Sequence, residues 1–369
     1  MKKNKTHYFS PGPASLPTEV IHRIHEELLD TFGIGVSILE ISHRSPQYDK
    51  FNAETLELCR SVFEVPETHS VLLSVCGAQQ HFSLLMHHLS REGDTIAYTD
   101  TGNWAHMAYE EAKNGGRDVR LVYDGGPNYQ TLGNPQEWDI PKHAKYLHLT
   151  VNNTVCGTEY KTIPTFGETP LVLDMTSSLG ARAIIPWEQT ALIYASAQKN
   201  FGIAGVSVII MRNDCLEKSR NLVKENRIGH AFSYPSIFDA ESRLNTPPVF
   251  SIFCMNRMLH WIKNEGGVTE MEARAQQKSN LVYSVIDNSD GFYKGYARPN
   301  DRSQHNFVFM LNSPEQDAHF IQEALKENIR EIKGYKSTGG VRASMYNGVT
   351  VESAHVFAEF MKSYLKRFG

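Results

Sequence analysis

The 369-residue sequence has few cysteines, no long apolar run and little net charge. Its five cysteines are scattered and form no C-x-x-C pair, which argues against a disulfide framework or a zinc site. No apolar run approaches the roughly 20 residues of a membrane span. No apolar segment follows the basic start of the chain either, so we expect no secretory signal. We therefore expect a soluble, cytoplasmic protein with reduced thiols and no membrane partner.

Charge and motifs exclude two further classes of protein. The net charge of −4 provides no overall field that would attract nucleic acid. The 16 histidines include no pair with a convincing metal-ligand spacing, so we expect no metal site. The chain contains neither a G-x-G-x-x-G run nor a Walker lysine, which makes nucleotide binding a poor interpretation. What remains is an ordinary globular composition, long enough for two domains.

Strand-like apolar runs alternate with helix-compatible or loop segments from about residue 70 onward. This alternation predicts an α/β domain with a mostly parallel seven-stranded sheet. The short gap between the last two runs predicts a hairpin-like return. An amphipathic helix is also predicted over 18–29. The seven runs lie at 71–75, 95–98, 119–122, 146–149, 171–173, 192–195 and 206–211.

The pattern changes around Gly266-Gly267. A long helix is predicted to begin near Thr269, and the later apolar segments at 306–311, 319–326 and 353–366 predict a smaller α+β domain. We therefore predict a large domain over 16–267 and a small C-terminal domain over 268–369. The N-terminal segment 1–15 is predicted to associate with the small domain.

An acid and a lysine follow two neighbouring strand-like runs. Asp174 ends the run at 171–173, and Lys199 stands just past the run at 192–195. Alone, such a lysine is most often solvated, and such an aspartate is most often a cap or turn residue. Together, at the carboxyl ends of strands, they match the needs of a pyridoxal phosphate (PLP) enzyme. The lysine amine forms a Schiff base with the cofactor aldehyde, and the carboxylate keeps the pyridine nitrogen protonated.

Four other segments fit this hypothesis, and each also has an ordinary explanation. The turn Gly77-Ala78-Gln79 precedes a helix whose N-terminal amides would bind phosphate, but it equally fits a tight βα turn. Trp104 follows another strand-like run and would stack on a ring, or simply fill the core. Arg44 and Arg342 offer planar guanidinium groups to anions, although surface ion pairs are the commoner role.

Taken together, these motifs resemble those of the phosphoserine aminotransferase family, which has fold type I of the PLP-dependent transferases and belongs to aminotransferase class V. The resemblance runs from about Phe9 to the C-terminus. Its motifs stand here as Phe9-Ser10-Pro11-Gly12-Pro13, Glu40-Ile41-Ser42-His43-Arg44-Ser45, Asp174-Met175-Thr176-Ser177, Ala197-Gln198-Lys199-Asn200, Asn245-Thr246-Pro247-Pro248 and Gly339-Gly340-Val341-Arg342-Ala343-Ser344-Met345-Tyr346-Asn347.

The resemblance implies a role for each matching residue toward the cofactor. Lys199 would be the Schiff-base lysine and Asp174 the partner of the pyridinium nitrogen. Trp104 would stack on the ring, and Thr154 would bond its hydroxyl. The cofactor phosphate would be held by the amides of Ala78 and Gln79 and by Thr176 and Gln198. Asn245 and Thr246 would reach the phosphate of a neighbouring subunit, which implies a homodimer with shared active sites.

The resemblance also implies the substrates: phosphoserine, glutamate and 2-oxoglutarate, in serine biosynthesis, with the related phosphohydroxythreonine step of vitamin B6 synthesis as an extension. Arg342 would clamp the substrate α-carboxylate. His43 and Arg44, supplied by the partner chain, would face the distal anion together with Lys336.

Three positions depart from the pattern common in bacterial members of the family. Gln79 replaces an arginine, Cys76-Gly77-Ala78 replaces a run of glycines, and Tyr335-Lys336 replaces a His-Arg pair. Lys336 keeps a positive charge but loses the bidentate fork of arginine. Losing one charge-assisted bond costs roughly 1.5–3 kcal/mol if nothing compensates. The substrate is therefore less specified than the reaction.

Three alternatives stay open at this point. A paralogous aminotransferase for a different anionic or small amino acid would not need the His43-Arg44 pair if the substrate side chain were small and neutral. A lyase or desulfurase of the same fold lacks an obvious catalytic cysteine loop in this sequence. A catalytically silent binding protein is disfavoured by the intact Lys199 and Asp174.

Overall fold

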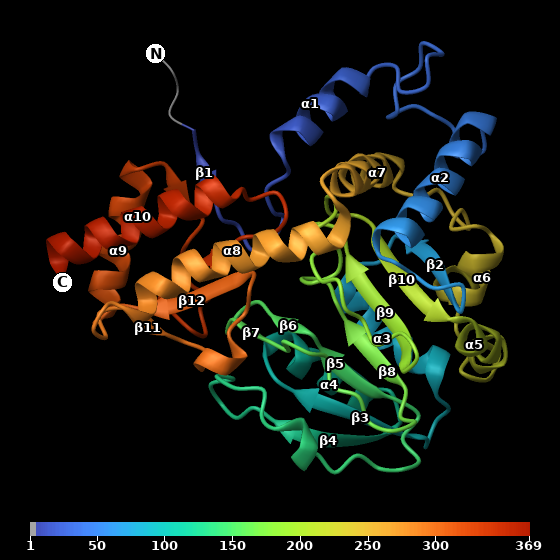
Figure 1. Cartoon of the computed structure of the whole chain (residues 1–369). Helices are drawn as coiled ribbons and strands as arrows, with labels where there is room; N and C mark the ends of the chain where they lie inside the picture. The colour runs from blue at the N-terminus through green and yellow to red at the C-terminus, as the bar shows by residue number, and fades with distance from the viewer. Residues whose placement is uncertain (1–4) are drawn as a thin grey trace.

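The computed structural model describes residues 5–369 and contains the predicted seven-stranded sheet (Figure 1). Neighbouring strands are parallel except β10, which runs antiparallel to both β2 and β9. The mostly parallel sheet and the hairpin-like return are therefore confirmed. In spatial order the strands are β2 (His69–Ser74), β10 (Ser207–Arg212), β9 (Thr190–Ser196), β8 (Leu171–Asp174), β5 (Leu147–Thr150), β3 (Thr95–Asp100) and β4 (Asp118–Asp124).

Helices cover both faces of the large sheet, so its central strands are buried at every position. Alternate residues of one strand enter different clusters: Ile193 of β9 packs in one and Tyr194 in the other. One face carries α1 (Thr18–Glu27), α2 (Pro46–Val62) and α7 (Val249–Asn264). The other carries α3 (Ala78–Leu89), α4 (Asn103–Asn114), α5 (Asn213–Glu225) and α6 (Tyr234–Asp239).

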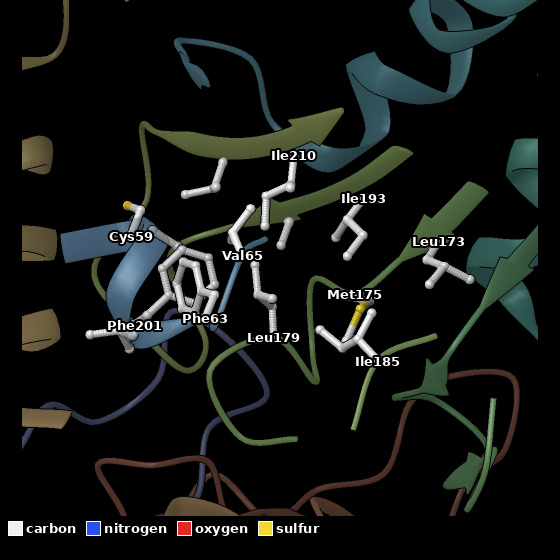
Figure 2. Close-up of a cluster of buried hydrophobic side chains, with 14 of the residues drawn as sticks. Cys59, Phe63, Val65, Leu173, Met175, Leu179, Ile185, Ile193, Phe201 and Ile210 are labelled. Atoms are coloured by element: carbon white, nitrogen blue, oxygen red, sulfur yellow. The ribbon is translucent and has the colours of Figure 1, made fainter. Parts of the chain in front are cut away.

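The first of these clusters anchors the segment that follows the predicted catalytic lysine. Figure 2 shows Leu173, Ile193 and Ile210, from three neighbouring strands, in the same cluster as Phe63 and Phe201. The rings of Phe63 and Phe201 meet edge to face with centroids 5.3 Å apart. Because Phe201 is fully buried only two residues after Lys199, the core holds the turn that presents the lysine.

A second, smaller sheet and its helices follow along the chain. They enclose a separate hydrophobic cluster, into which Phe9 of the N-terminal segment also packs. The sheet has the order β11 (Lys294–Gly295), β12 (Asn306–Met310) and β14 (Val341–Ser344). Its neighbours are α8 (Gly267–Asp287), α9 (Pro314–Lys326) and α10 (Val351–Phe368), and the remaining short strands are β1 (His7–Tyr8), β6 (Asn152–Asn153), β7 (Thr158–Glu159) and β13 (Ile329–Arg330).

The long helix α8 begins at Gly267, close to the predicted start near Thr269, and leads from α7 to the small sheet (Figure 1). The strand β1 pairs in parallel with β13. Both observations are compatible with the division proposed at 267 and 268, which stays a prediction; residues 1–4 of the N-terminal segment lie outside the described residues.

Over residues 5–369, no helix is long and apolar enough to cross a membrane. In the same part of the chain, no group of three or more histidine, cysteine, aspartate or glutamate side chains is arranged to hold a metal ion. The five cysteines are all buried and unbridged.

Candidate active site

A cavity of about 420 Å³ lies at the carboxyl ends of the parallel strands, where ligands bind in open α/β sheets. The structure brings most of the sequence-predicted site residues together in its wall. The lining residues are Pro11, Gly12, Gly77, Ala78, Gln79, Phe82, Trp104, Thr150, Asn152, Thr154, Asp174, Thr176, Ser177, Gln198, Lys199, Tyr335 and Arg342.

Lys199 reaches into this cavity from the turn after β9. The pKa of Lys199 is lowered to about 8, mainly by burial; the Asp174 carboxylate opposes this shift, and the nearby Arg342 guanidinium adds to it. An amine with a depressed pKa is partly deprotonated near neutral pH, which makes it a usable nucleophile and base. Lys199 therefore has the chemistry that a carbonyl cofactor requires.

Asp174 is buried at the end of β8. The backbone N–H of Thr176 donates to its Oδ1 atom over 2.9 Å. Burial raises the pKa of Asp174, while the Thr176 hydrogen bonds and the positive charge of Lys199 lower it. The carboxylate is thus supplied with groups that favour its ionised form, the form that would hold a protonated pyridine nitrogen.

The N-terminus of α3 forms one end of the cavity. Its first amides belong to Ala78 and Gln79, and the positive end of the helix dipole favours an anion there. The Ala78 N–H donates to Ser196 Oγ over 2.7 Å, so this amide would bind phosphate only by sharing or exchanging that bond. Thr176 and Gln198 line the same cavity, as the resemblance implies.

Trp104, Thr154 and Arg342 form another part of the wall. The indole Nε1–H of Trp104 donates to Thr154 Oγ1 over 3.2 Å, and Arg342 Nη1 donates to the Thr154 carbonyl over 3.4 Å. The Nε atom of Arg342 is buried and has no hydrogen-bond partner among the described residues. A buried guanidinium left with an unpaired donor is suited to an incoming carboxylate.

Some predicted site residues do not line this cavity. His43 and Arg44 lie in the loop before α2, Asn245 and Thr246 are exposed before α7, and Lys336 is exposed beside Tyr335. Since a single chain is described, the roles assigned to the first four through a partner subunit stay predictions. The role of Lys336 toward a substrate also stays a prediction.

The structure also adds residues that sequence reasoning missed. A Cβ atom at Gly12 would lie 3.5 Å from Cγ of Lys199, so the N-terminal segment passes directly over the lysine. Asn152 donates from Nδ2 to Ser177 Oγ and to Asn306 Oδ1, both over 2.8 Å, and so connects the cavity wall with the small sheet. In the sequence, the signals that could have indicated these contacts were the Pro11-Gly12-Pro13 run and the Asn152-Asn153 pair.

Comparison with known proteins places the chain in a class defined by this fold and site. The family model for class-V aminotransferases matches residues 6–357, so the chain belongs to the class-V aminotransferase family. Its similarity is to the phosphoserine aminotransferases of that family. The chain is 37% identical over 360 residues to the phosphoserine aminotransferase of Halalkalibacterium halodurans, covering 98% of both chains.

Solved structures agree with this placement. The phosphoserine aminotransferase from Bacillus circulans subsp. alkalophilus superposes with a TM-score of 0.93 at 35% identity over 100% of both chains. A PLP-bound phosphoserine aminotransferase from Trichomonas vaginalis superposes with a TM-score of 0.90 at 30% identity, covering 97% of this chain and 100% of the other. The family resemblance and the fold-type I architecture expected from the sequence are confirmed.

Proposed function

We propose that this chain is a PLP-dependent phosphoserine:2-oxoglutarate aminotransferase that interconverts 3-phosphohydroxypyruvate and glutamate with O-phosphoserine and 2-oxoglutarate. The observation that carries the proposal is one cavity holding Lys199, Asp174 and a guanidinium, that of Arg342, with an unpaired donor. The curated relatives with this name cover the chain almost completely, which supports a role in serine biosynthesis. The phosphohydroxythreonine step is a further candidate reaction of the same site.

The residues present fit PLP. Asp174 would hold the pyridine nitrogen, Trp104 and Thr154 the ring, and the amide of Gln79 with Thr176 and Gln198 the phosphate. When bound, the cofactor supplies an aldehyde for amines and a ring that accepts the electron pair of the substrate Cα–H bond.

The protein's own groups account for the remaining chemistry. Arg342 holds the substrate α-carboxylate and so orients Cα toward Lys199. The Lys199 amine takes the proton from Cα as a base and, as an acid, would then give it to the aldehyde-derived C4′ carbon of the cofactor instead of back to Cα. The depressed pKa of Lys199, about 8, suits both directions near neutral pH.

The distal anion of phosphoserine or glutamate needs a cationic partner of its own, because Arg342 is assigned to the α-carboxylate and Lys199 to the cofactor. Lys336 is close in sequence to the cavity residue Tyr335, and His43 and Arg44 would come from a second copy. We therefore include a homodimer with shared active sites in the proposal. A cytoplasmic location is also part of the proposal.

The test is a single-turnover assay on purified protein loaded with PLP. Phosphoserine, glutamate, serine and alanine are added separately, and the keto acid formed per active site is measured. Rapid conversion of only phosphoserine and glutamate would support the proposal. Conversion of glutamate without phosphoserine would contradict the phosphoserine assignment and favour a paralogue for another anionic amino acid.

A further inference from the structure

A tyrosine on the neighbouring strand lies beside Asp174. Asp174 and Tyr194 are register partners of the parallel strands β8 and β9, and the Tyr194 side chain is fully buried. The Tyr194 hydroxyl is the weakest of the groups that lower the pKa of Asp174, after Thr176 and Lys199, and the Thr176 N–H is the donor at hydrogen-bond distance from Oδ1. Because both residues stand on paired strands, the sheet itself sets their relative position.

A histidine lies behind this tyrosine. His148, on β5, places its Nε2 atom 2.8 Å from the Tyr194 hydroxyl. The His148 ring is stacked on Tyr98, with centroids 4.7 Å apart and an interplanar angle of 17°. Burial lowers the pKa of His148 to about 3 and raises that of Tyr194, so both side chains are neutral at neutral pH. The three groups thus form a buried chain that carries one negative charge, at Asp174.

The direction of the hydrogen bonds follows from the number of protons available. A tyrosine hydroxyl has one proton to donate, to either His148 or Asp174. Donation to His148 would deprive the carboxylate of a bond and leave the His148 Nδ1–H buried; this atom has no partner among the described residues. Donation to Asp174 forms a charge-assisted bond and lets His148 Nε2–H donate to the tyrosine oxygen. The second arrangement satisfies more of the buried groups.

We propose that Tyr194 and His148 are positioning residues that keep the Asp174 carboxylate ionised and aimed at the pyridine nitrogen of the cofactor; this rests on the proposed function. Tyr194 supplies the proton that the carboxylate accepts. His148 orients the tyrosine hydroxyl so that its proton faces Asp174 and does not face His148. Without them, fewer groups would oppose the burial that favours the neutral acid, which holds a protonated pyridine nitrogen poorly.

The first test is Tyr194→Phe in the PLP-loaded enzyme, reconstituted with cofactor labelled with 15N in the ring. The 15N chemical shift reports protonation of the pyridine nitrogen. We expect the signal to move from the wild-type position toward that of Asp174→Asn. We also expect kcat to fall about tenfold to a hundredfold, the range of a lost hydrogen bond to a charged group. KM should change little, because the substrate does not touch Tyr194.

The matched control is Tyr146→Phe. Tyr146, the residue immediately before β5 in the sequence, is also fully buried. Its hydroxyl is hydrogen-bonded to that of Tyr98 over 3.1 Å. Its substitution removes the same atom and a comparable buried hydrogen bond. Because Tyr146 is not bonded to Asp174, its 15N signal should remain at the wild-type position even if the melting temperature falls.

A second pair of variants tests the histidine and covers the case in which Tyr194→Phe does not fold. His148→Leu removes the donor to Tyr194 and should move the 15N signal part of the way. His148→Gln keeps an N–H donor on a side chain of similar reach and should restore the wild-type signal. A merely structural role of His148 would affect stability in both variants without separating their 15N signals.

The outcomes separate this inference from the proposed function. Wild-type protein that binds no PLP, or an Asp174→Asn signal equal to wild type, would overturn the proposed roles of the site and this inference with them. A shifted Asp174→Asn signal with unshifted Tyr194→Phe and His148→Leu signals would overturn this inference alone. Shifts in all three, with an unshifted Tyr146→Phe signal, would support it.

Discussion

Lys199 and Asp174 face the same cavity and act on each other's ionisation: the carboxylate raises the pKa of the lysine, and the ammonium lowers the pKa of the acid. Burial acts on both groups in the opposite sense and outweighs this coupling at each: the pKa of Lys199 falls to about 8, and the pKa of Asp174 is raised. The site thus keeps one reactive amine and one carboxylate close together without fully neutralising either.

Lys199→Ala should abolish turnover of every amino acid while the fold survives. The amine is the proposed cofactor attachment point and the proposed base at substrate Cα, and no other lysine lines the cavity. Single-turnover formation of keto acid measures the loss, and circular dichroism with a thermal melt verifies the fold. Full activity in this variant would contradict the central assignment. Lys333→Ala, at an exposed lysine shortly before β14, should remain active.

Arg342→Lys should lower kcat/KM about tenfold to a hundredfold, since it replaces a bidentate fork by a point charge at a charge-assisted contact. The α-carboxylate is common to phosphoserine and glutamate, so both substrates should lose equally. Steady-state kinetics with each substrate measure the effect. A loss confined to phosphoserine would assign Arg342 to the distal anion instead.

Lys336→Gln should raise the KM for phosphoserine about tenfold, the lower end for losing a charge-assisted contact to a phosphate. The matched control is Lys333→Gln, which removes an exposed charge from the same region three residues earlier. Equal effects of the two variants would reduce the role of Lys336 to general electrostatic attraction.

Mixing Lys199→Ala protein with Arg44→Ala protein tests the shared site. If Arg44 acts in the partner's active site, a mixed dimer contains one site with both residues intact. Random reassociation of a two-fold dimer should then restore about a quarter of wild-type activity. The activity of the mixture after unfolding and refolding together is measured against each variant refolded alone. No recovery in the mixture would place Arg44 in its own chain's site, and full activity of Arg44→Ala protein alone would place it outside the reaction.

Lys278 provides a test of stability against pH. It is buried in α8, and its Nζ atom donates to the carbonyls of Tyr346 and Val349 over 2.9 and 3.1 Å. Burial lowers the pKa of Lys278 from 10.5 to about 7. The unfolded chain therefore binds one more proton than the folded chain between about pH 7 and 10.5, so this group makes stability rise with pH in that window.

Lys278→Met removes this titration. The free energy of unfolding of Lys278→Met minus that of wild type should be largest below pH 7. This difference should decline steadily as the pH approaches 10. The two lost hydrogen bonds shift the whole comparison but do not depend on pH. Urea unfolding at several pH values measures the difference, with the exposed Lys263→Met as control. A difference that does not change with pH would show that Lys278 stays charged in the folded protein.

The helix predicted over 18–29 shows where sequence patterns fall short. The observed α1 ends at Glu27, because the chain turns there and the Leu28 carbonyl accepts hydrogen bonds from the backbone N–H of Ile38 and from Ser37 Oγ. Leu29, the last apolar residue of the predicted helix, is 76% exposed. Apolar periodicity predicts a face but not what covers it, and here nothing in the described chain covers Leu29.

The strand-end positions of Asp174 and Lys199 were predictable, because a parallel sheet brings the carboxyl ends of its strands to one edge whatever their separation in sequence. The same local logic placed the Ala78-Gln79 turn and Trp104 at the cavity. Residue type, strand periodicity and turn composition were sufficient for these, and together with the family motifs they determined the fold and the reaction class.

Only the tertiary structure placed Gly12 over Lys199, connected Asn152 to Asn306, and aligned His148, Tyr194 and Asp174. Each of these contacts joins residues on different strands or segments, and the sequence carries no local signal for the distance between them. Their geometry depends on strand register and on packing between the two sheets. The sequence by itself therefore determined which groups perform the chemistry, and the folded structure decided what holds those groups in place.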